Sequence, residues 1–417
     1  MAKIRRLITP AIAISFCVSL VWASPIRAQT SRPLASAGWP STNGLIVFRS
    51  DRDGEPDIFT LDAGTQAITK LTTTPGTREL QPAWSPDGSR IVYARKLRAS
   101  GKTDLYVMNA NGKGRKRLTS TQVAERDPTW SPDGTRIAYA APTGPHGPLR
   151  IFVINANGTG RRQVTTEGGS GDDRSPTWSP DGTRIAYVSD RSGGFPDVYL
   201  IDVDGKGFRR LTEDNVIEGN PSWSPDGTTI AVERCCADGS SEVASIDVAT
   251  GAQTDLTNTT ANEFDPAWSP DGGRLVYVAV PAAGGNVDVW VMNADGSAQT
   301  RLTTEAADDL SPDWQPVPVC TISGTSKADE LTGTDGNDVI FAKGGDDVVR
   351  ARDGNDLIYG ASGSDSLDGQ IGNDLVFGQG GGDALDGGPG YDGLFGDAGV
   401  DSCVKGADGA LTSSCES

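Results

Sequence analysis

The chain has 417 residues, of which 55 are acidic and 37 are basic, so its formal net charge is −18. The length allows one large domain and a smaller one. The acidic residues gather toward the C-terminus, where residues 317–417 hold 18 acidic and 5 basic side chains. Such a surface repels nucleic acid and anionic lipid and attracts cations, which excludes nucleic acid as an expected partner.

The N-terminus has the pattern of an export signal. Basic Lys3, Arg5 and Arg6 precede the apolar run 7–22, and small residues follow. This pattern predicts a signal peptide over residues 1–28, cleaved after Ala23 or Ala28. The apolar run is short for a membrane span, and no later stretch reaches about 18 apolar residues. We therefore expect a bacterial protein that is secreted or displayed at the cell surface without a stable membrane span. An uncleaved anchor stays open as the alternative.

Export also permits disulfides. Five cysteines follow the predicted signal, an odd number that leaves at least one outside any intrachain pair: Cys235, Cys236, Cys320, Cys403 and Cys415. Cys403 and Cys415 are spaced to close a short C-terminal loop. A bridge between the adjacent Cys235 and Cys236 would be strained. The pairing stays open at this point, although Cys403–Cys415 is the favoured choice.

A repeat of about 46 residues runs through the first three quarters of the chain. The motif Trp-Ser-Pro-Asp-Gly begins at Trp84, Trp130, Trp178, Trp223 and Trp268, and Trp39 and Trp314 continue the series in degenerate form. Each interval holds β-rich runs separated by Asp, Asn and Gly turns, and the third run ends in Leu-Thr or Val-Thr. Short strands with regular turn chemistry indicate an all-β fold. Four strands per 40–50 residues are typical of a propeller blade.

These motifs resemble the TolB-type (WD40-like) propeller repeat. The resemblance covers residues 39–316 and implies a six-bladed β-propeller that acts as a platform for protein partners. Leu310–Pro316 would supply the Pro-x-Trp strand that the first blade lacks, so one strand from each end would close the ring and remove exposed edges. We expect the repeated tryptophans to serve packing and the Pro-Asp-Gly segments to serve as turns.

An acidic column recurs three residues before each blade proline: Glu79, Glu125, Asp173, Glu218, Glu263 and Asp309. Since the Pro-x-Trp strand is innermost in such propellers, these side chains are a possible ring at one mouth of the central channel. One interpretation is a repeated hydrogen bond within or between blades. The other is a site for a cation or a cationic ligand. Crowded carboxylates raise one another's pKa, so we expect a cation or Arg and Lys partners beside them.

A second repeat, nine residues long, fills 324–404, after a linker over 317–323 and before a tail over 405–417. Its sixth position is Asp in all nine units, its fourth is Gly in all but the first, and its eighth is apolar or Cys. Gly-x-Asp turns bend carbonyl oxygens around a cation, and Asp adds a charged oxygen. Ca²⁺ takes six to eight oxygen ligands and needs no His or Cys.

The nonapeptide resembles the hemolysin-type (RTX) calcium-binding repeat, which implies a parallel β-roll. In that family two units make one turn, and each ion lies between the loops of units n and n+2. We therefore predict several bound Ca²⁺ ions and folding coupled to them. The calcium sites at both ends of the roll are expected to be weak or absent. The predicted ligands are Asp338, Asp347, Asp356, Asp365, Asp374, Asp383, Asp392, Gly336, Gly345, Gly354, Gly363, Gly372, Gly381 and Gly390.

Signals of catalysis are few. The chain has no Gly-x-Ser-x-Gly motif, and its one histidine, His146, is in a Gly- and Pro-rich segment. We therefore expect no enzyme activity, no catalytic residues and no organic cofactor. The expected function is that of a secreted calcium-binding protein whose propeller binds an unidentified protein or cell-surface partner. A hydrolase or lyase that uses channel carboxylates is the alternative, and a matrix protein built around the acidic roll is another.

Overall fold

The computed structural model describes residues 41–166, 171–214, 216–235, 240–281, 284–404, 411–413 and 415. The predicted signal peptide, Trp39 and Cys236 lie outside these residues. In the described part of the chain every regular element is a β-strand, and no helix there is long and apolar enough to cross a membrane. The all-β prediction is confirmed.

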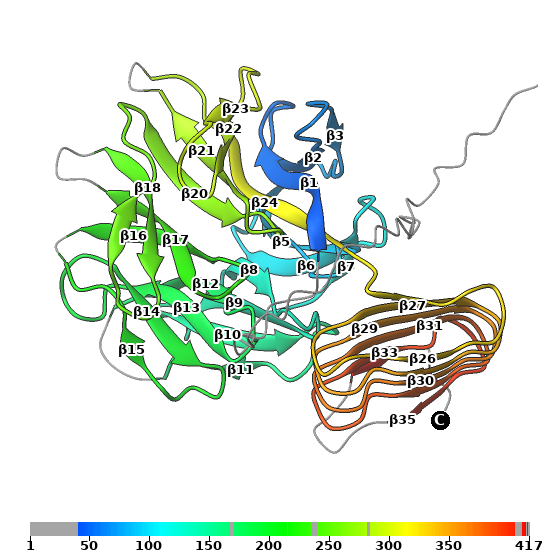
Figure 1. Cartoon of the computed structure of the whole chain (residues 1–417). Helices are drawn as coiled ribbons and strands as arrows, with labels where there is room; N and C mark the ends of the chain where they lie inside the picture. The colour runs from blue at the N-terminus through cyan, green and yellow to red at the C-terminus, as the bar shows by residue number, and fades with distance from the viewer. Residues whose placement is uncertain are drawn as a thin grey trace, which may run out of the picture. The chain divides into compact units, whose positions relative to one another are not determined.

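Six antiparallel sheets of four strands each form the propeller, shown from blue to yellow in Figure 1. Blade one contains β1 (Ser41–Ser50), β2 (Asp57–Leu61), β3 (Ile68–Lys70) and β24 (Asp309–Pro318). Blade two contains β4 (Thr77–Trp84), β5 (Arg90–Leu97), β6 (Thr103–Asn109) and β7 (Lys116–Arg117). Blade three contains β8 (Arg126–Trp130), β9 (Arg136–Pro142), β10 (Leu149–Asn155) and β11 (Arg162–Gln163).

The other three blades repeat this order. Blade four contains β12 (Asp173–Trp178), β13 (Arg184–Ser189), β14 (Asp197–Asp202) and β15 (Arg209–Arg210). Blade five contains β16 (Ile217–Trp223), β17 (Thr229–Cys235), β18 (Ser241–Asp247) and β19 (Gln253–Asp255). Blade six contains β20 (Asn262–Trp268), β21 (Arg274–Val280), β22 (Asp288–Asn293) and β23 (Thr300–Arg301).

Blade one is closed by strands from both ends of the domain. Strand β24 pairs antiparallel with β1, with Trp314 opposite Ile46 and Asp309 opposite Ser50. An ion pair of 3.0 Å between Arg52 and Asp309 joins the same two segments. The predicted closure is therefore confirmed, and no blade presents an unpaired inner edge created by the chain ends.

The repeated motif forms the junctions between blades. Trp130 is 5% exposed and lies beneath the guanidinium of Arg90, 4.7 Å from the ring centre, in the preceding blade. In the turn, the N–H of Gly88 donates to the carbonyl of Ser85 at 2.8 Å. Gly88 has a φ of +68°, which L side chains rarely adopt, so glycine is required there. The hydrophobic core is distributed as clusters within and between blades rather than as one central mass.

The nonapeptides fold as a parallel β-roll of two sheets, drawn from gold to red in Figure 1. One sheet contains β25 (Ile322–Ser323), β27 (Val339–Gly344), β29 (Leu357–Ser362), β31 (Leu375–Gly381), β33 (Gly393–Phe395) and β36 (Leu411–Ser413), with β34 (Ala398–Gly399) paired to β31. The other contains β26 (Glu330–Thr332), β28 (Val348–Arg350), β30 (Ser366–Asp368), β32 (Ala384–Asp386) and β35 (Ser402–Val404).

Paired strands of the roll are offset by two nonapeptides, as Ile340 opposite Ile358 shows. The apolar eighth positions meet between the two sheets in one thin cluster, which includes Ile358, Leu367 and Val376. A ladder of stacked rings follows the same offset, with centroids 4.7–5.1 Å apart: Phe341, Tyr359, Phe377 and Phe395. A disulfide joins Cys403 to Cys415, the pair that the sequence favoured.

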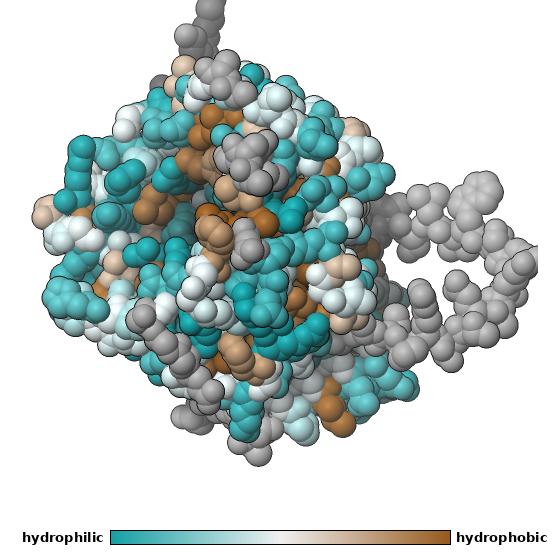
Figure 2. Space-filling model, turned by 90° about the vertical axis from the view of Figure 1, so that its left-hand side faces the viewer, coloured by the Kyte–Doolittle hydropathy of each residue, from teal (hydrophilic) through white to brown (hydrophobic). Residues whose placement is uncertain are grey.

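The surface of the protein is mainly polar. The face in Figure 2 is largely hydrophilic, with apolar side chains gathered in smaller patches between polar ones. Among the described residues, large exposed apolar side chains are few and include Phe195, Phe208 and Ile371. Scattered apolar groups of this kind are normal on folded proteins and need no partner to explain them.

Candidate metal centre

Two columns of aspartates follow the two edges of the β-roll, where the chain turns from one sheet to the other. Each column takes the sixth position of every second nonapeptide, because two units make one turn. The backbone N–H of every aspartate except Asp392 and Asp401, the last of each column, donates to Oδ1 of the aspartate eighteen residues later, at 2.7–3.0 Å. One column contains Asp329, Asp347, Asp365, Asp383 and Asp401, and the other contains Asp338, Asp356, Asp374 and Asp392.

The second carboxylate oxygen of most of these residues has no hydrogen-bond partner among the residues that the structure describes. Oδ2 is buried without a hydrogen bond in Asp347, Asp356, Asp365, Asp374, Asp383 and Asp401, and each of these residues is at most 2% exposed. Burying a charged oxygen without a partner costs free energy, and native proteins rarely leave such atoms unsatisfied. These oxygens are therefore suited to accept a cation or to hold a proton.

The glycines of the turns allow the backbones of successive turns to lie close together at the edges of the roll. Gly372 has a φ of +146°, and a Cβ added there would lie 1.6 Å from the carbonyl oxygen of Gly354 in the preceding turn. Gly381 is in the same situation, since its Cβ would lie 1.5 Å from the carbonyl oxygen of Gly363. No side chain fits at this fourth position, so the backbone oxygens of successive turns stay close to the aspartates. The same applies to Gly363 and Gly390.

This donor set fits calcium. All the available groups are oxygens, as Ca²⁺ prefers. Within the described residues no three His, Cys, Asp or Glu side chains converge on one point. A cation at either edge would therefore combine aspartate carboxylates of neighbouring turns with backbone oxygens. This is the arrangement that the glycine–aspartate pattern predicts.

Burial raises the pKa of the stacked carboxyl groups. The pKa of Asp356 rises to about 8, chiefly through burial and also through repulsion by Asp338 and Asp353. The pKa of Asp374 rises to about 9 by burial and by the charges of Asp356 and Asp392. On the other edge the pKa of Asp365 rises to about 6 for the same main reason. A divalent cation beside these groups would favour their charged form.

The first turn differs from the others. Thr334 donates its backbone N–H and its hydroxyl to Oδ2 of Asp338, at 2.7 and 3.0 Å. Thr325 satisfies Oδ2 of Asp329 in the same way, at 2.6 and 2.8 Å. In Asp329 and Asp338, Oδ2 therefore has a threonine partner in its own turn. In most later turns Oδ2 of the aspartate has no hydrogen-bond partner among the described residues. The structure sets Asp338 apart from the other predicted ligands, whereas Asp401 shares their geometry.

An asparagine ladder adjoins the Asp356 column, and the sequence reading missed it. The N–H of Asn355 donates to Oδ1 of Asn337 at 2.7 Å, and the N–H of Asn373 donates to Oδ1 of Asn355 at 2.8 Å. Tyr391 continues the ladder by donating its N–H to Asn373 at 2.9 Å. The signal was present as three Gly-Asn-Asp triplets eighteen residues apart, at a position that the repeat pattern treats as variable.

The six acids of the propeller column do not form an open ring. All six are at most 2% exposed: Glu79, Glu125, Asp173, Glu218, Glu263 and Asp309. Three have arginine neighbours, namely Arg95 at 3.5 Å from Glu79, Arg191 at 2.6 Å from Asp173, and Arg52 at 3.0 Å from Asp309.

The other three acids of the column accept hydrogen bonds from threonines: Glu125 from Thr119 and Thr121, Glu218 from Thr212, and Glu263 from Thr259. Buried carboxylates need such partners, and these interactions hold the segments at the blade junctions together. In place of a solvent-facing ring at the mouth, the structure thus has six buried acids with separate partners, and Oε2 of Glu79 and of Glu263 accepts no hydrogen bond from the described residues.

The residue before each blade proline surrounds the axis of the propeller instead. These six residues share a φ between 45° and 53°: Gln81, Asp127, Ser175, Asn220, Asp265 and Ser311. Each lies at a bulge in the inner strand of its blade. The bulges turn the side chains toward the next blade, where they form polar bridges between inner strands.

The distances between these six residues are typical of hydrogen bonds. The amide of Asn220 donates to Asp265 at 2.6 Å, and the N–H of Ser175 donates to Asp127 at 3.2 Å. Residues before proline usually adopt extended conformations, so a positive φ at these six positions is not expected from the sequence. The polar character of all six positions was the available signal.

Comparison with known proteins identifies both repeats. The TolB beta propeller domain matches residues 77–170, 143–264 and 221–319, which together span more than half of the chain. The chain belongs to the TolB beta propeller family. The RTX calcium-binding nonapeptide repeat matches residues 323–358, 341–376 and 359–394 of the same chain. RTX repeats typically bind Ca²⁺ and are typical of secreted bacterial proteins.

Individual relatives resemble only the propeller. The Tol-Pal system protein TolB of Francisella tularensis subsp. mediasiatica is 33% identical over 94 residues, which are 22% of this chain and 21% of that protein. The chain thus spans about a fifth of the length of the curated relatives it matches.

Solved structures agree in fold. TolB from Acinetobacter baumannii superposes with a TM-score of 0.57 at 24% identity over 65% of this chain and 66% of that one. A putative TolB from Agrobacterium tumefaciens has a TM-score of 0.52 at 22% identity, over 66% of this chain and 92% of that one.

Proposed function

We propose that this TolB-family chain is an exported, non-catalytic binding protein in which the propeller carries a protein or cell-surface partner and the β-roll folds with calcium. The observation that carries the calcium part is the set of buried aspartate oxygens without partners along both edges of the roll. The family match and the separate arginine and threonine partners of the buried acids support a structural use of the propeller acids.

The roll has little else to stabilise it. Its core is a single layer of small and medium apolar side chains between two sheets, such as Val349, Ile358 and Leu367. The thin layer must offset the chain entropy of a glycine-rich segment, and the stacked carboxylates repel one another. Bound Ca²⁺ would neutralise these carboxylates and join successive turns. The glycine cradles and the Asp Oδ1 bonds set the spacing at which the chain presents its oxygens.

A calcium titration of the full chain tests this proposal. In excess chelator we expect the propeller to retain its β-sheet signal, while the roll loses its own. Adding calcium should restore the missing circular dichroism signal, with a midpoint on the order of 10⁻⁴–10⁻³ M, as for extracellular modules. Isothermal calorimetry should then count several ions per chain. A chain whose spectrum and heat signal do not respond to millimolar calcium would contradict the proposal.

The absence of catalysis is tested separately. The buried acids of the propeller are hydrogen bonded to threonines and arginines, an arrangement that supports packing rather than proton transfer to a substrate. We expect no turnover on a panel of glycans and peptides, with or without calcium. Sustained hydrolysis or elimination by the purified chain that is lost in Glu218→Gln would favour the catalytic alternative. Export is tested by detecting the chain in the culture medium or the envelope fraction.

A further inference from the structure

Two adjoining pockets lie beside the axis of the propeller. The first, here the axial pocket, has a volume of about 360 Å³, and its lining includes Arg49, Leu80, Lys96, Arg126, Leu310 and Ser311. These residues come from the inner strands β24, β4 and β8 of three successive blades and from their neighbours β1 and β5. The axial pocket therefore exists only when the ring is closed by β24.

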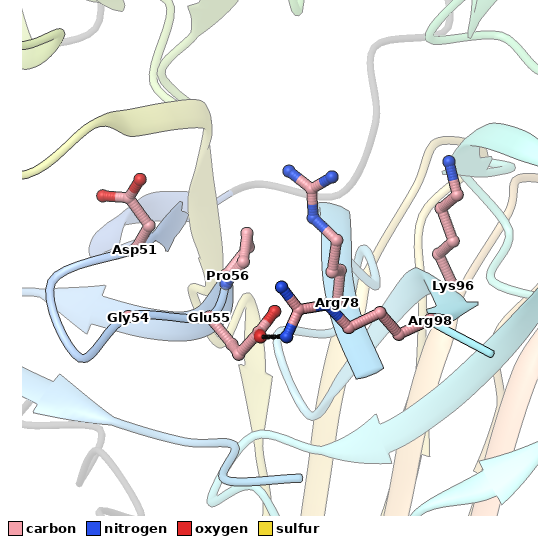
Figure 3. Close-up of a pocket in the computed structure, with 7 residues that line it drawn as sticks. All are labelled: Asp51, Gly54, Glu55, Pro56, Arg78, Lys96 and Arg98. Atoms are coloured by element: carbon pink, nitrogen blue, oxygen red, sulfur yellow. Dashed lines mark hydrogen bonds and ion pairs between the residues drawn. The ribbon is translucent and has the colours of Figure 1, made fainter. Parts of the chain in front are cut away.

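The second, here the rim pocket, has a volume of about 290 Å³ and shares Lys96 with the axial pocket. Figure 3 shows Arg78 and Lys96 both pointing upward in this view, while Arg98 turns to Glu55 and forms an ion pair with it. The paired Arg98 and Glu55 neutralise each other. Arg78 and Lys96 take no part in this ion pair.

Four cations around the two pockets have no anionic partner among the described residues: Arg49, Arg78, Lys96 and Arg126. The Nε atom of Arg49 is buried and makes no hydrogen bond. Burial lowers the pKa of Arg49 and the nearby charge of Arg78 lowers it further, while the charges of Asp265, Asp51 and Asp308 act in the opposite direction. Arg49, Arg78, Lys96 and Arg126 also repel one another around the two pockets, and an anion bound between them would relieve that repulsion.

The neighbouring acids are already engaged. Glu125 lines the axial pocket, but its carboxylate accepts hydrogen bonds from the hydroxyls of Thr119 and Thr121. Asp309 is bound by Arg52 at 3.0 Å. Asp51, in the rim pocket, accepts the N–H of Asp308 at 2.9 Å. These bonds hold the acids in place without removing their charge, but the two linings together contain five cations and three acids, so the pockets keep an excess of positive charge that a ligand can reach.

We propose that the axial and rim pockets bind an acidic peptide segment through its carboxylates. The four cations recognise the carboxylates, and Leu80, Leu310 and Ala124 contact the apolar side chains between them. Guanidinium groups match carboxylates with paired hydrogen bonds, which suits the three arginines. The volumes fit a few side chains of an extended strand. A nucleic acid, by contrast, would meet the repulsion of the whole acidic chain.

This inference rests on the proposed role of the propeller as a binding platform and names the chemistry of its partner. The test uses the full chain saturated with calcium and a fluorescent peptide of alternating glutamate and leucine, with a glutamine–leucine peptide as the uncharged control. Fluorescence anisotropy should show binding of the acidic peptide at low salt and at least tenfold weaker binding of the control. Raising the salt concentration should weaken the acidic peptide's binding.

Variants locate the binding. Arg78→Met and Arg126→Met change exposed side chains, so the fold should persist, and each should weaken peptide binding about fivefold to tenfold. Lys116→Met removes an exposed charge outside the two pockets and should leave the affinity unchanged. Inorganic phosphate is the competitor arm: if millimolar phosphate binds as tightly as the peptide, the pockets take a free oxyanion and the inference fails.

Equal binding of the glutamine–leucine peptide, or unchanged affinity in both Arg78→Met and Arg126→Met, would also overturn the inference. Neither result would contradict the propeller's wider role, because a partner of other chemistry could still bind elsewhere on the blades. Loss of calcium-dependent folding in the roll, measured on the same samples, would contradict the proposed function without affecting the peptide result. The two failures are therefore distinguishable.

Discussion

The backbone N–H of Asp356 donates a 2.7 Å hydrogen bond to Oδ1 of Asp374, one turn of the roll further along the chain. In turn, Oδ1 of Asp356 accepts the N–H of Asp338 at 2.8 Å. Asp356 thus uses one oxygen to hold the adjacent turn and keeps the other for a ligand. A single carboxylate therefore serves both the register of the roll and its candidate calcium site.

Asp356→Ala should weaken calcium binding far more than Asp353→Ala, although the two residues are three positions apart. Asp356 is fully buried with Oδ2 unpartnered, while Asp353 is exposed and reaches the next turn only through a backbone bridge to Ile371. Removing Asp356 also leaves the N–H of Asp338 without its acceptor. Calcium titrations followed by circular dichroism should show a midpoint at least fivefold higher in Asp356→Ala. Equal midpoints in the two variants would contradict the assigned roles.

Asn355→Ala should destabilise the calcium-loaded roll by about 1 kcal/mol, because the N–H of Asn373 loses its acceptor. Thermal unfolding in excess calcium measures the change. Ser364→Ala is the matched control, since Ser364 occupies the same position of a unit on the other edge and engages there through its backbone N–H. If both variants unfold like the parent chain, the asparagine ladder contributes nothing to stability.

Removing the Cys403–Cys415 disulfide should loosen the C-terminal end of the roll. The bridge closes a loop with a sequence separation of 12, for which the loss of chain-entropy restraint amounts to about 3 kcal/mol. Cys403 lies in β35, which pairs with β32, so fraying should begin at the last turn. Hydrogen exchange in the Cys403→Ser, Cys415→Ser double variant should rise around β35 and leave β27 unchanged. Uniform exchange along the roll would contradict this local effect.

The sequence was most informative where a repeat imposes one geometry on many residues. The Trp-Ser-Pro-Asp-Gly motif predicted the blade turns and junctions, and the nonapeptide predicted both the offset of eighteen residues and the core position of Ile358. In each case a local rule, turn chemistry or strand alternation, fixes the structure.

The sequence was least informative where partners come from distant parts of the chain. Nothing in the local sequence of Glu218 shows that Gln253 of β19 will donate to its carboxylate, and nothing before Pro128 shows that Asp127 adopts a positive φ. The axial and rim pockets likewise combine strands that are far apart in the chain, so no sequence motif predicts them. Tertiary contacts of this kind require the closed ring.

Stability of the propeller should fall as the pH rises from about 5 to 8. Burial raises the pKa of Glu218 to about 8, with further contributions from the charges of Asp214 and Asp197, so the folded state binds a proton that the unfolded chain releases near its ordinary pKa of 4.5. A raised pKa in an acid means that the folded state binds more protons between those two values, and stability therefore decreases with pH in that window. Glu233 and Glu263, whose pKa values rise to about 7 mainly through burial, act in the same direction.

Glu218→Gln should remove part of this dependence. The glutamine keeps an oxygen for the hydroxyl of Thr212, which lies 2.9 Å from the carboxylate in the parent chain, but has no charge to bury. In excess calcium the variant should melt at a higher temperature than the parent at pH 8, by roughly 2–4 °C for each kcal/mol relieved, and similarly to the parent at pH 5. Glu305→Gln, which changes an exposed glutamate, should follow the parent at both pH values. If Glu218→Gln keeps the full pH dependence of the parent, the buried carboxyl of Glu218 is not one of its sources.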